Sequence, residues 1–356
     1  MALSTIRSSG VRNLIINGAM QVAQRGDTTG VTVGYGGPDR YKFARDGAAE
    51  VTLSQDTTVP SNQGFKSSLK IDVTTADSSL AAGDYALIST RLEGQNLQHL
   101  LYGTSAAKKV TLQFWVRSPK TGTHIVELYH GDVFYTNAQT YTITSADTWQ
   151  KVTLTYDGYQ TSVLNNDSGI GLQIAWWLAS GSTYAGGTLS SNTWQNTAAN
   201  RAVGQVNVMD STSNNFYLTG VQLEVGEEAS DFEHRSFGDE LRRCQRYYYK
   251  LSPGSVASGY ASCNSNNTSR SDALCHFPVT MREIPTAVET TGTATDYGSL
   301  TAGVNVNCNS VPTFVRASLN TSFVRFPYAS SSVTTGQAGI IQAKSTDSFL
   351  AWSAEL

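Results

Sequence analysis

Alternation of apolar and polar residues is the dominant pattern in the middle of the chain. It recurs in six segments, at residues 110–118, 123–130, 149–158, 169–180, 203–210 and 216–226. A period of two residues is typical of a strand with one face against a core. Turn-forming clusters such as SPKTG, NNDSG and SGSTYAGG separate the segments, without intervening amphipathic helices. The pattern therefore predicts an antiparallel β-sandwich, most specifically a jelly roll over residues 38–235.

One later segment departs from this pattern. The residues FGDELRRCQRYYYK predict a short helix that Gly238 or Asp239 caps, with Leu241 and Cys244 on one side. We expect it to form a junction at residues 236–248. Strand-like segments resume after it, so a smaller C-terminal β domain is expected over 249–356, and residues 1–37 are expected to be an N-terminal arm or docking segment. The chain is thus predicted to be all-β, with helix in less than about a tenth of its residues.

Composition narrows the classes of partner. Charged residues make up 15% of the 356 residues, against roughly 25% in an average soluble domain. The polar surface is therefore rich in Ser, Thr, Asn, Gln and Gly, which suits neutral, hydroxyl-rich partners. A net charge of −3 provides no basic field for phosphates, so we expect no nucleic-acid binding.

The sequence also lacks several common functional signals. No apolar run approaches the roughly 18 residues that span a bilayer, and the first residues do not resemble a secretion signal, so neither membrane insertion nor the usual secretory route is expected. No metal-binding histidine spacing, nucleophile elbow or phosphate-binding loop occurs. The four cysteines form no C-x-x-C pair and are expected to be reduced core residues. We expect no catalytic residues, no metal and no cofactor.

Three blocks of sequence resemble a known family. NLIINGAMQVAQRG at 13–26 with PDRYKFARDG at 38–47 resembles the opening of many bacteriophage tail-fibre and virion-appendage proteins. The run from FYLTGVQLEVG through RYYYK at 216–250, followed by FPVTMREIPTA at 277–287, resembles their later portion in the same order. The central strands resemble carbohydrate-binding-module jelly rolls.

The resemblance implies a virion structural protein that is assembled in the host cytoplasm and is commonly a homotrimer. Its implied partners are copies of itself, other virion proteins and a polysaccharide of the host cell surface, and it implies no enzyme. The leading hypothesis is a tail fibre or receptor-binding appendage. Two alternatives stay open: a capsid decoration or tail adaptor with a purely structural role, and a glycan depolymerase, for which no motif isolates the required pair of carboxylates.

The outward faces of the predicted strands suggest a sugar-binding platform. In the segment 110–117, Val110, Leu112, Phe114 and Val116 form a core face, and the opposite face is polar and aromatic. If neighbouring strands pair with it, one surface would carry Gln113, Trp115, Arg117, Glu127, Tyr129, Gln173, Trp177, Gln222 and Glu224. Aromatic faces and planar polar groups are what sugar rings require, and few charges point to a neutral or weakly charged polysaccharide bound through several weak sites.

Other interpretations of these aromatic residues remain. Trp115 and Trp177 would instead pack beneath a loop or a neighbouring subunit, since aromatics are common in cores and interfaces. Trp176 has the opposite phase and is predicted to be core. Tyr184 and Trp194 lie in a Gly/Ser/Asn-rich connection, where they are either exposed binding residues or caps on the sandwich.

Overall fold

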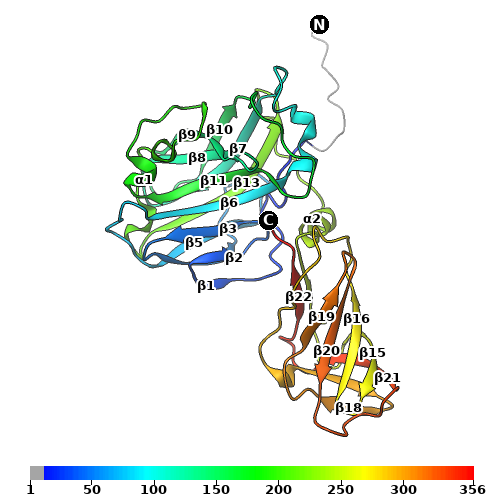
Figure 1. Ribbon diagram of the computed structural model, residues 1–356. Coiled ribbons are helices and arrows are strands. Elements are labelled where there is room, and N and C mark those ends of the chain that lie inside the picture. The colour runs from blue at the N-terminus through cyan, green and yellow to red at the C-terminus, as the bar shows by residue number, and fades with distance from the viewer. Residues whose placement is uncertain (1–11) are drawn as a thin grey trace. The chain divides into compact units, whose positions relative to one another are not determined.

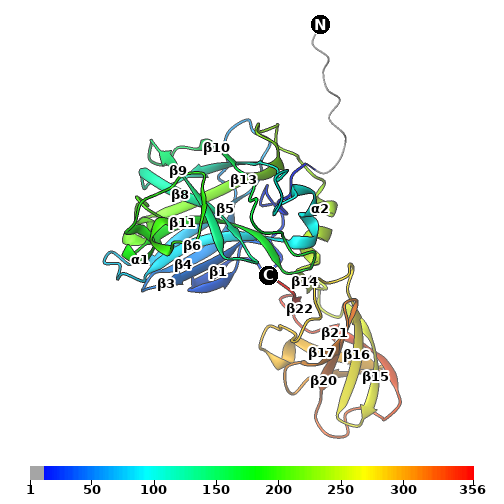
Figure 2. The same ribbon diagram turned by 45° about the horizontal axis from the view of Figure 1, so that its top comes forward.

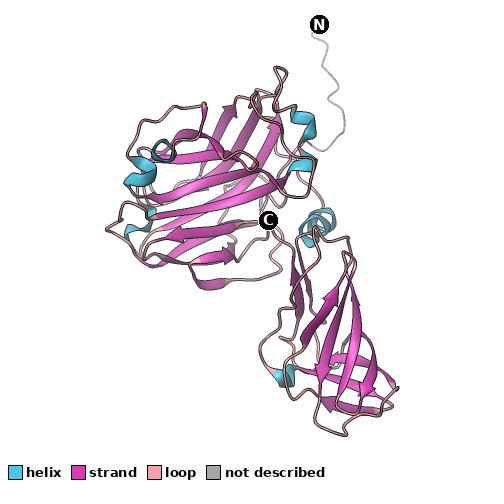
Figure 3. Cartoon of the chain, in the orientation of Figure 1, coloured by secondary structure: helices cyan, strands magenta, loops and turns pink. Residues whose placement is uncertain are grey.

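The computed structural model describes residues 12–356, which form two compact units, the first ending at Glu240 and the second covering Leu241–Leu356 (Figure 1). Strands account for 43% of the chain and helices for 8% (Figure 3). Every pairing between strands is antiparallel within the described residues. The predictions of an all-β fold and of little helix are confirmed.

The first unit contains two sheets. The six-stranded sheet has the order β1 (Thr28–Val31), β4 (Glu50–Asp56), β5 (Ser68–Thr75), β13 (Asn215–Val225), β7 (Val110–Arg117) and β10 (Gln150–Tyr156). The seven-stranded sheet has the order β12 (Trp194–Gln195), β9 (Tyr135–Ile143), β8 (Gly122–His130), β11 (Ile170–Ser180), β6 (Tyr85–Glu93), β3 (Lys42–Asp46) and β2 (Val33–Tyr35). Short helices in the connections are η1 (Gly94–Asn96), η2 (Gln98–Leu100), α1 (Ser182–Ala185), η3 (Ala198–Asn200) and η4 (Val208–Asp210).

The two sheets pack face to face as a jelly-roll sandwich, and the layers can be followed in Figures 1 and 2. From β5 to β8 the chain changes sheet at every connection, and it does so again from β9 to β11. The inward residues of both sheets join in one core, in which the Phe114 ring of β7 meets the Trp176 ring of β11 edge-on at 5.6 Å. Burial of these apolar faces is the main favourable term holding the sheets together.

The expected strand at 203–210 is wrong. This segment contains the short helix η4, whose first turn is capped by Asn207, since the Met209 amide donates to Asn207 Oδ1 at 2.8 Å. Val208 and Met209 are adjacent in sequence and both are fully buried. Two consecutive buried side chains do not fit a half-buried strand, in which neighbours point to opposite faces.

The N-terminal segment belongs to the first unit. Residues 1–11 lie outside the described part of the chain, but Ile15 and Met20 are buried in the sandwich core. Arg235 holds the same segment by donating to the backbone carbonyls of Asn13 and Ile15, the latter at 2.9 Å. The first unit therefore begins well before residue 38, where the sequence placed the start of the jelly roll.

Helix α2 (Phe237–Gln245) begins earlier than its expected caps, Gly238 and Asp239. Its N-terminal cap is Ser236, whose hydroxyl accepts a hydrogen bond from the Asp239 amide at 3.2 Å. A serine hydroxyl at this position satisfies one of the free N–H groups of the first turn. The short helix itself is present in the predicted junction.

The second unit is a smaller β domain. Its seven-stranded sheet has the order β18 (Val304–Asn307), β17 (Tyr297–Thr301), β21 (Ala338–Ala343), β15 (Gly259–Asn267), β16 (Arg270–His276), β20 (Thr321–Pro327) and β19 (Thr313–Ala317). A separate pair joins β14 (Tyr248–Leu251) to β22 (Leu350–Ser353), and η5 (Ala294–Asp296) precedes β17. The Tyr249 ring stacks on the buried Trp352 ring at 5.9 Å. All four cysteines are buried with free thiols, as expected.

A buried histidine predicts acid sensitivity of the first unit. His124 of β8 is fully buried, its Nε2 lies 3.0 Å from the Lys120 carbonyl oxygen, and its ring stacks on Tyr141 at 5.4 Å. Burial lowers the pKa of His124 to about 4. The unfolded chain, with an ordinary histidine pKa of about 6.5, therefore takes up the proton first as the pH falls. Stability is lost progressively from about pH 6.5 down to pH 4, by about 2 kcal/mol at pH 5.

Urea unfolding of wild type and His124→Phe at pH 7 and pH 5 measures this effect. Phenylalanine keeps the ring against Tyr141 but does not titrate, so the variant should lose about 2 kcal/mol less than wild type between the two pH values. His130, whose pKa is also lowered by burial, remains in both proteins and adds the same acid dependence to each. Equal losses in the two proteins would contradict the prediction.

Candidate functional site

The predicted single platform is divided between two sheets. Gln113, Trp115 and Arg117 lie on β7, in the six-stranded sheet, whereas β8 and β11 belong to the seven-stranded sheet. Since the apolar residues of each strand face the shared core, the polar residues of the two sheets point away from each other. The pattern correctly identified the outward residues, but alternation says which face a residue occupies and not which sheet its strand joins.

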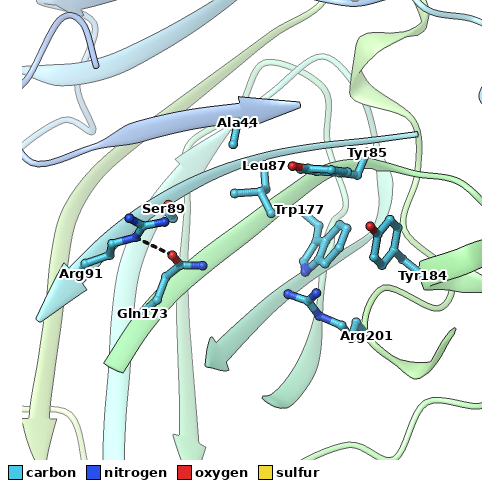
Figure 4. A pocket seen from close by; sticks show the side chains of 9 residues that line it. All are labelled: Ala44, Tyr85, Leu87, Ser89, Arg91, Gln173, Trp177, Tyr184 and Arg201. Carbon is cyan, nitrogen blue, oxygen red and sulfur yellow. Dashed lines mark hydrogen bonds between the residues drawn. The ribbon is translucent and has the colours of Figure 1, made fainter. Parts of the chain in front are cut away.

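A cavity of about 200 Å³ lies on the outer face of the seven-stranded sheet (Figure 4). Strands β3, β6 and β11 form its floor, and the connection between β11 and β13 supplies one wall. Its lining residues are Ala44, Tyr85, Leu87, Ser89, Arg91, Gln173, Trp177, Tyr184 and Arg201. We call this space the first cavity.

Three aromatic side chains surround one end of the first cavity. The Tyr184 ring, from α1, lies 5.3 Å from the Trp177 ring and 5.6 Å from the Tyr85 ring. Trp177 is only 1% exposed, while the two tyrosines are half-buried. The tyrosine rings are thus the accessible apolar surfaces, and Trp177 supports them. Burial raises the pKa of Tyr85 further above the ordinary tyrosine value, so its hydroxyl is a hydrogen-bond donor at neutral pH.

Arg201 and Glu127 form an ion pair beneath this end of the cavity. The carboxylate of Glu127 is fully buried and accepts two hydrogen bonds from the Arg201 guanidinium, one from Nε at 3.1 Å. The same guanidinium lies 5.1 Å from the centre of the Trp177 ring and 5.8 Å from that of Tyr184. Arg201 therefore ties the connection between β11 and β13 to the sheet, and its positive charge is balanced by Glu127. Because this connection contains α1, we call it the α1 connection.

Planar polar groups line the other end. Arg91 of β6 pairs in register with Gln173 of β11, and Arg91 Nε donates to Gln173 Oε1 at 2.7 Å (Figure 4). This bond fixes the planes of both groups. Flat guanidinium and amide groups beside aromatic rings can bind the hydroxyl groups and the C–H faces of a sugar ring.

Among the predicted binding residues, Tyr129, Arg117 and Trp194 lie outside the lining of the first cavity. Tyr129 lies on β8, where its ring is 6.0 Å from Phe134. Arg117 donates from Nε to the Asp147 carbonyl oxygen at 2.8 Å and holds the β9–β10 turn. Trp194 donates to the Asp157 carbonyl oxygen at 2.7 Å and packs against the Tyr159 ring at 5.2 Å. These contacts favour structural roles for Arg117 and Trp194.

Polar residues on the outer face of the six-stranded sheet hold the segment of chain that follows β13 against this sheet. Gln113 Nε2 donates to the Ser230 carbonyl oxygen at 2.8 Å, and Gln222 Oε1 accepts from the Glu233 amide at 2.8 Å. Glu224 accepts from the Ser230 amide at 2.6 Å. These contacts give Gln222 and Glu224 a structural role in holding the chain, in place of the sugar contacts that the sequence suggested. Gln113 and Trp115 line a separate cavity of about 240 Å³ on this face.

Tyr85, Ser89, Arg91 and Arg201 line the first cavity but were not among the residues predicted from the sequence. The first three alternate with the core residues Ala86, Ile88 and Leu92, so the period of two in β6 was available as a signal. Arg201 follows η3 in a long irregular connection. No periodic pattern points to it, because its position depends on the buried partner that it finds on β8.

Neither a metal site nor a membrane-spanning helix is found in the part of the chain from residue 12 onward. No group of three or more His, Cys, Asp or Glu side chains is arranged to hold a metal ion there. None of the helices in this part combines the length and apolar character needed to cross a membrane.

Comparison with known proteins gives distant structural matches. No protein-family model matches the chain, and no curated protein matches it. One similar structure is the enzymatically active domain of bacteriophage CBA120 tailspike protein 4, at 12% identity and a TM-score of 0.33, covering 60% of this chain and 21% of that one. The chain thus matches only about a fifth of the tailspike domain.

Two carbohydrate-binding modules are also similar. A CBM4 module is 15% identical with a TM-score of 0.30, covering 59% of this chain and 98% of the module. The family 11 module from Clostridium thermocellum, in complex with a mixed-linked β-1,3-1,4 tetrasaccharide, is 12% identical with a TM-score of 0.28, covering 59% and 98%. At identities and TM-scores this low, the functions of these proteins cannot be assigned to this chain. Any binding function therefore has to be inferred from the cavity itself.

Proposed function

We propose that this chain binds a glycan in the first cavity and serves as a non-enzymatic attachment protein of a bacteriophage virion, as a tail fibre or receptor-binding appendage. The observation that carries the binding proposal is the combination of Tyr85 and Tyr184 with the fixed Arg91–Gln173 pair around one cavity. The phage assignment rests on the sequence resemblance at 13–26, 38–47, 216–250 and 277–287.

The lining favours a neutral or weakly charged polysaccharide. The Arg201 charge is neutralised by Glu127, which leaves Arg91 as the other charged side chain of the lining, and no carboxylate lines the first cavity among residues 12–356. The same feature supports a non-enzymatic role, because glycoside hydrolysis commonly requires two carboxylates that flank the bond to be broken. Glu127 is paired with Arg201 and does not line the first cavity.

Binding at one such site is expected to be weak. In water, each hydrogen bond contributes a net binding free energy on the order of 1 kcal/mol, and each contact between a sugar and an aromatic ring contributes a similar amount. We propose that a homotrimer carrying three copies of the cavity, repeated over several appendages, raises the avidity by roughly 10² to 10⁴. Weak single sites then suffice for attachment to a host surface.

Replacement of Tyr184 by alanine tests the proposed function. Tyr184 is half-buried and sits at the accessible edge, so Tyr184→Ala should weaken binding to host envelope glycan about tenfold or more. Phe134→Ala is the matched control, because Phe134 is 70% exposed and does not line the cavity. Adsorption is measured by glycan array and by retention on host cells, with light scattering to compare oligomeric states.

The outcomes separate the candidate functions. Loss of adsorption in Tyr184→Ala but not in Phe134→Ala supports receptor binding through the first cavity. Equal adsorption of wild type and both variants would overturn the assignment of the cavity. Absence of any glycan binding by the wild-type oligomer would leave the purely structural role as the better explanation.

A further inference from the structure

The cavity on the six-stranded sheet is not used by the proposed function. It lies on the outer face of β7, β10 and β13. Its lining includes Phe65, Gln113, Trp115, Lys151, Phe232 and His234. We call it the second cavity. Its lining belongs entirely to the first unit.

A bulge in β13 creates space for the rings of the second cavity. The pairing of β13 with β7 shifts between Thr219 and Gln222, and Gly220 within this bulge has a φ of 63°. A Cβ atom on Gly220 would lie 2.7 Å from Phe65 and 2.9 Å from Trp115. The two rings therefore lie directly against bare backbone, which only glycine permits here without displacing them.

The segment that follows β13 completes the cavity. Its backbone is held on the sheet by Gln113 and Gln222, at Ser230 and Glu233 respectively. This brings the Phe232 ring to 5.0 Å from Phe65, and the His234 ring to 5.4 Å from Phe65. A cluster of aromatic faces thus stands next to Trp115, at a position fixed by hydrogen bonds.

One buried acceptor in this lining has no partner within residues 12–356. Gln113 is 1% exposed, and its Nε2 must be the donor to the Ser230 carbonyl oxygen, which leaves Oε1 as the other atom of the amide. Gln113 Oε1 is buried and makes no hydrogen bond. A buried acceptor of this kind requires a donor. An O–H or N–H group that enters the cavity would provide one.

We infer that the second cavity is an independent binding site for a single hydroxyl-bearing ring, such as one sugar unit. The aromatic faces would contact its C–H surface, Gln113 Oε1 would accept from one hydroxyl, and Lys151, which is exposed at the rim, would donate to another. A volume of about 240 Å³ is small for a ligand site and accommodates one ring, whether the sugar is free or is one unit of a longer chain. The site is separate from the first cavity because the two sheets face opposite ways.

The test uses the full chain in a Tyr184→Ala background, in which the first cavity is impaired. Saturation-transfer NMR with glucose, galactose, mannose and N-acetylglucosamine measures binding of monosaccharides. We expect at least one sugar to bind with a dissociation constant on the order of millimolar. Adding Trp115→Ala should remove this signal, and adding Lys151→Ala should weaken it by roughly threefold. Phe134→Ala, added to the same background, should leave it unchanged.

A second variant covers the case in which Trp115→Ala does not fold. Trp115→Phe keeps a ring against Gly220 while reducing the aromatic surface, and it should weaken binding by about threefold to tenfold. Loss of all sugar binding in Tyr184→Ala alone would overturn the second site and leave the proposed function standing. Monosaccharide binding that survives Tyr184→Ala but not Trp115→Ala supports the second site, even if polysaccharide binding proves insensitive to Tyr184.

Discussion

Glu127→Ala should destabilise the first unit by about 3 kcal/mol and abolish binding at the first cavity. Removing one partner of a buried ion pair leaves the other charge uncompensated, at a typical cost of 3 to 5 kcal/mol. The Arg201 side chain retains 23% of its exposure, so the lower end of that range applies. Binding is lost because the guanidinium that ties the α1 connection to Trp177 and Tyr184 no longer has a fixed position.

A double variant separates stability from binding in this case. Glu127→Leu combined with Arg201→Met replaces the pair by apolar side chains, which is often neutral for stability. It should recover most of the free energy of unfolding, measured by urea denaturation, without recovering glycan binding. A Glu127→Ala protein as stable and as active as wild type would show that Arg201 does not depend on this partner.

The elements of the sandwich were predictable where one side of a strand faces the core. In β7 the buried Val110, Leu112, Phe114 and Val116 alternate with polar or aromatic residues, and the sequence alone assigned both faces correctly. The same reasoning placed Trp176 in the core. Apolar burial is a local requirement of each strand, so it leaves a record in the sequence.

The arrangement of the candidate sites was not predictable in the same way. β7 and β8 follow each other in the chain, and the predicted platform required them to lie in one sheet, yet they lie in different sheets. Sheet membership depends on long-range pairing, such as that of β8 with β11, which no local pattern encodes. The contribution of Arg201 depends in the same way on a contact with Glu127, 74 residues away in sequence. The partition into two cavities therefore appears only in the folded chain.

The adjacent tryptophans of β11 should differ in what their removal costs. Trp176→Ala should lower the stability of the first unit by about 4 kcal/mol, within the range of 3 to 5 kcal/mol for buried aromatic residues. Trp176 is fully buried between the sheets, where it contacts Phe114 and Tyr41. Two hydrogen-bonded sheets cannot close around the space it leaves, so the melting temperature should fall by about 10 °C.

Trp177→Ala should cost about half as much, roughly 2 kcal/mol, although Trp177 is also only 1% exposed. The outer side of Trp177 faces the α1 connection and the first cavity. Because the α1 connection is irregular, it can move in to fill part of the space that the indole ring leaves. Glycan binding should be lost in Trp177→Ala and retained in Trp176→Phe, which keeps a ring in the core and removes an indole N–H that has no partner within the described residues. Thermal unfolding and glycan binding of all three variants measure this difference. A larger loss of stability for Trp177→Ala than for Trp176→Ala would mean that the α1 connection, rather than the space between the sheets, is the more rigidly packed region.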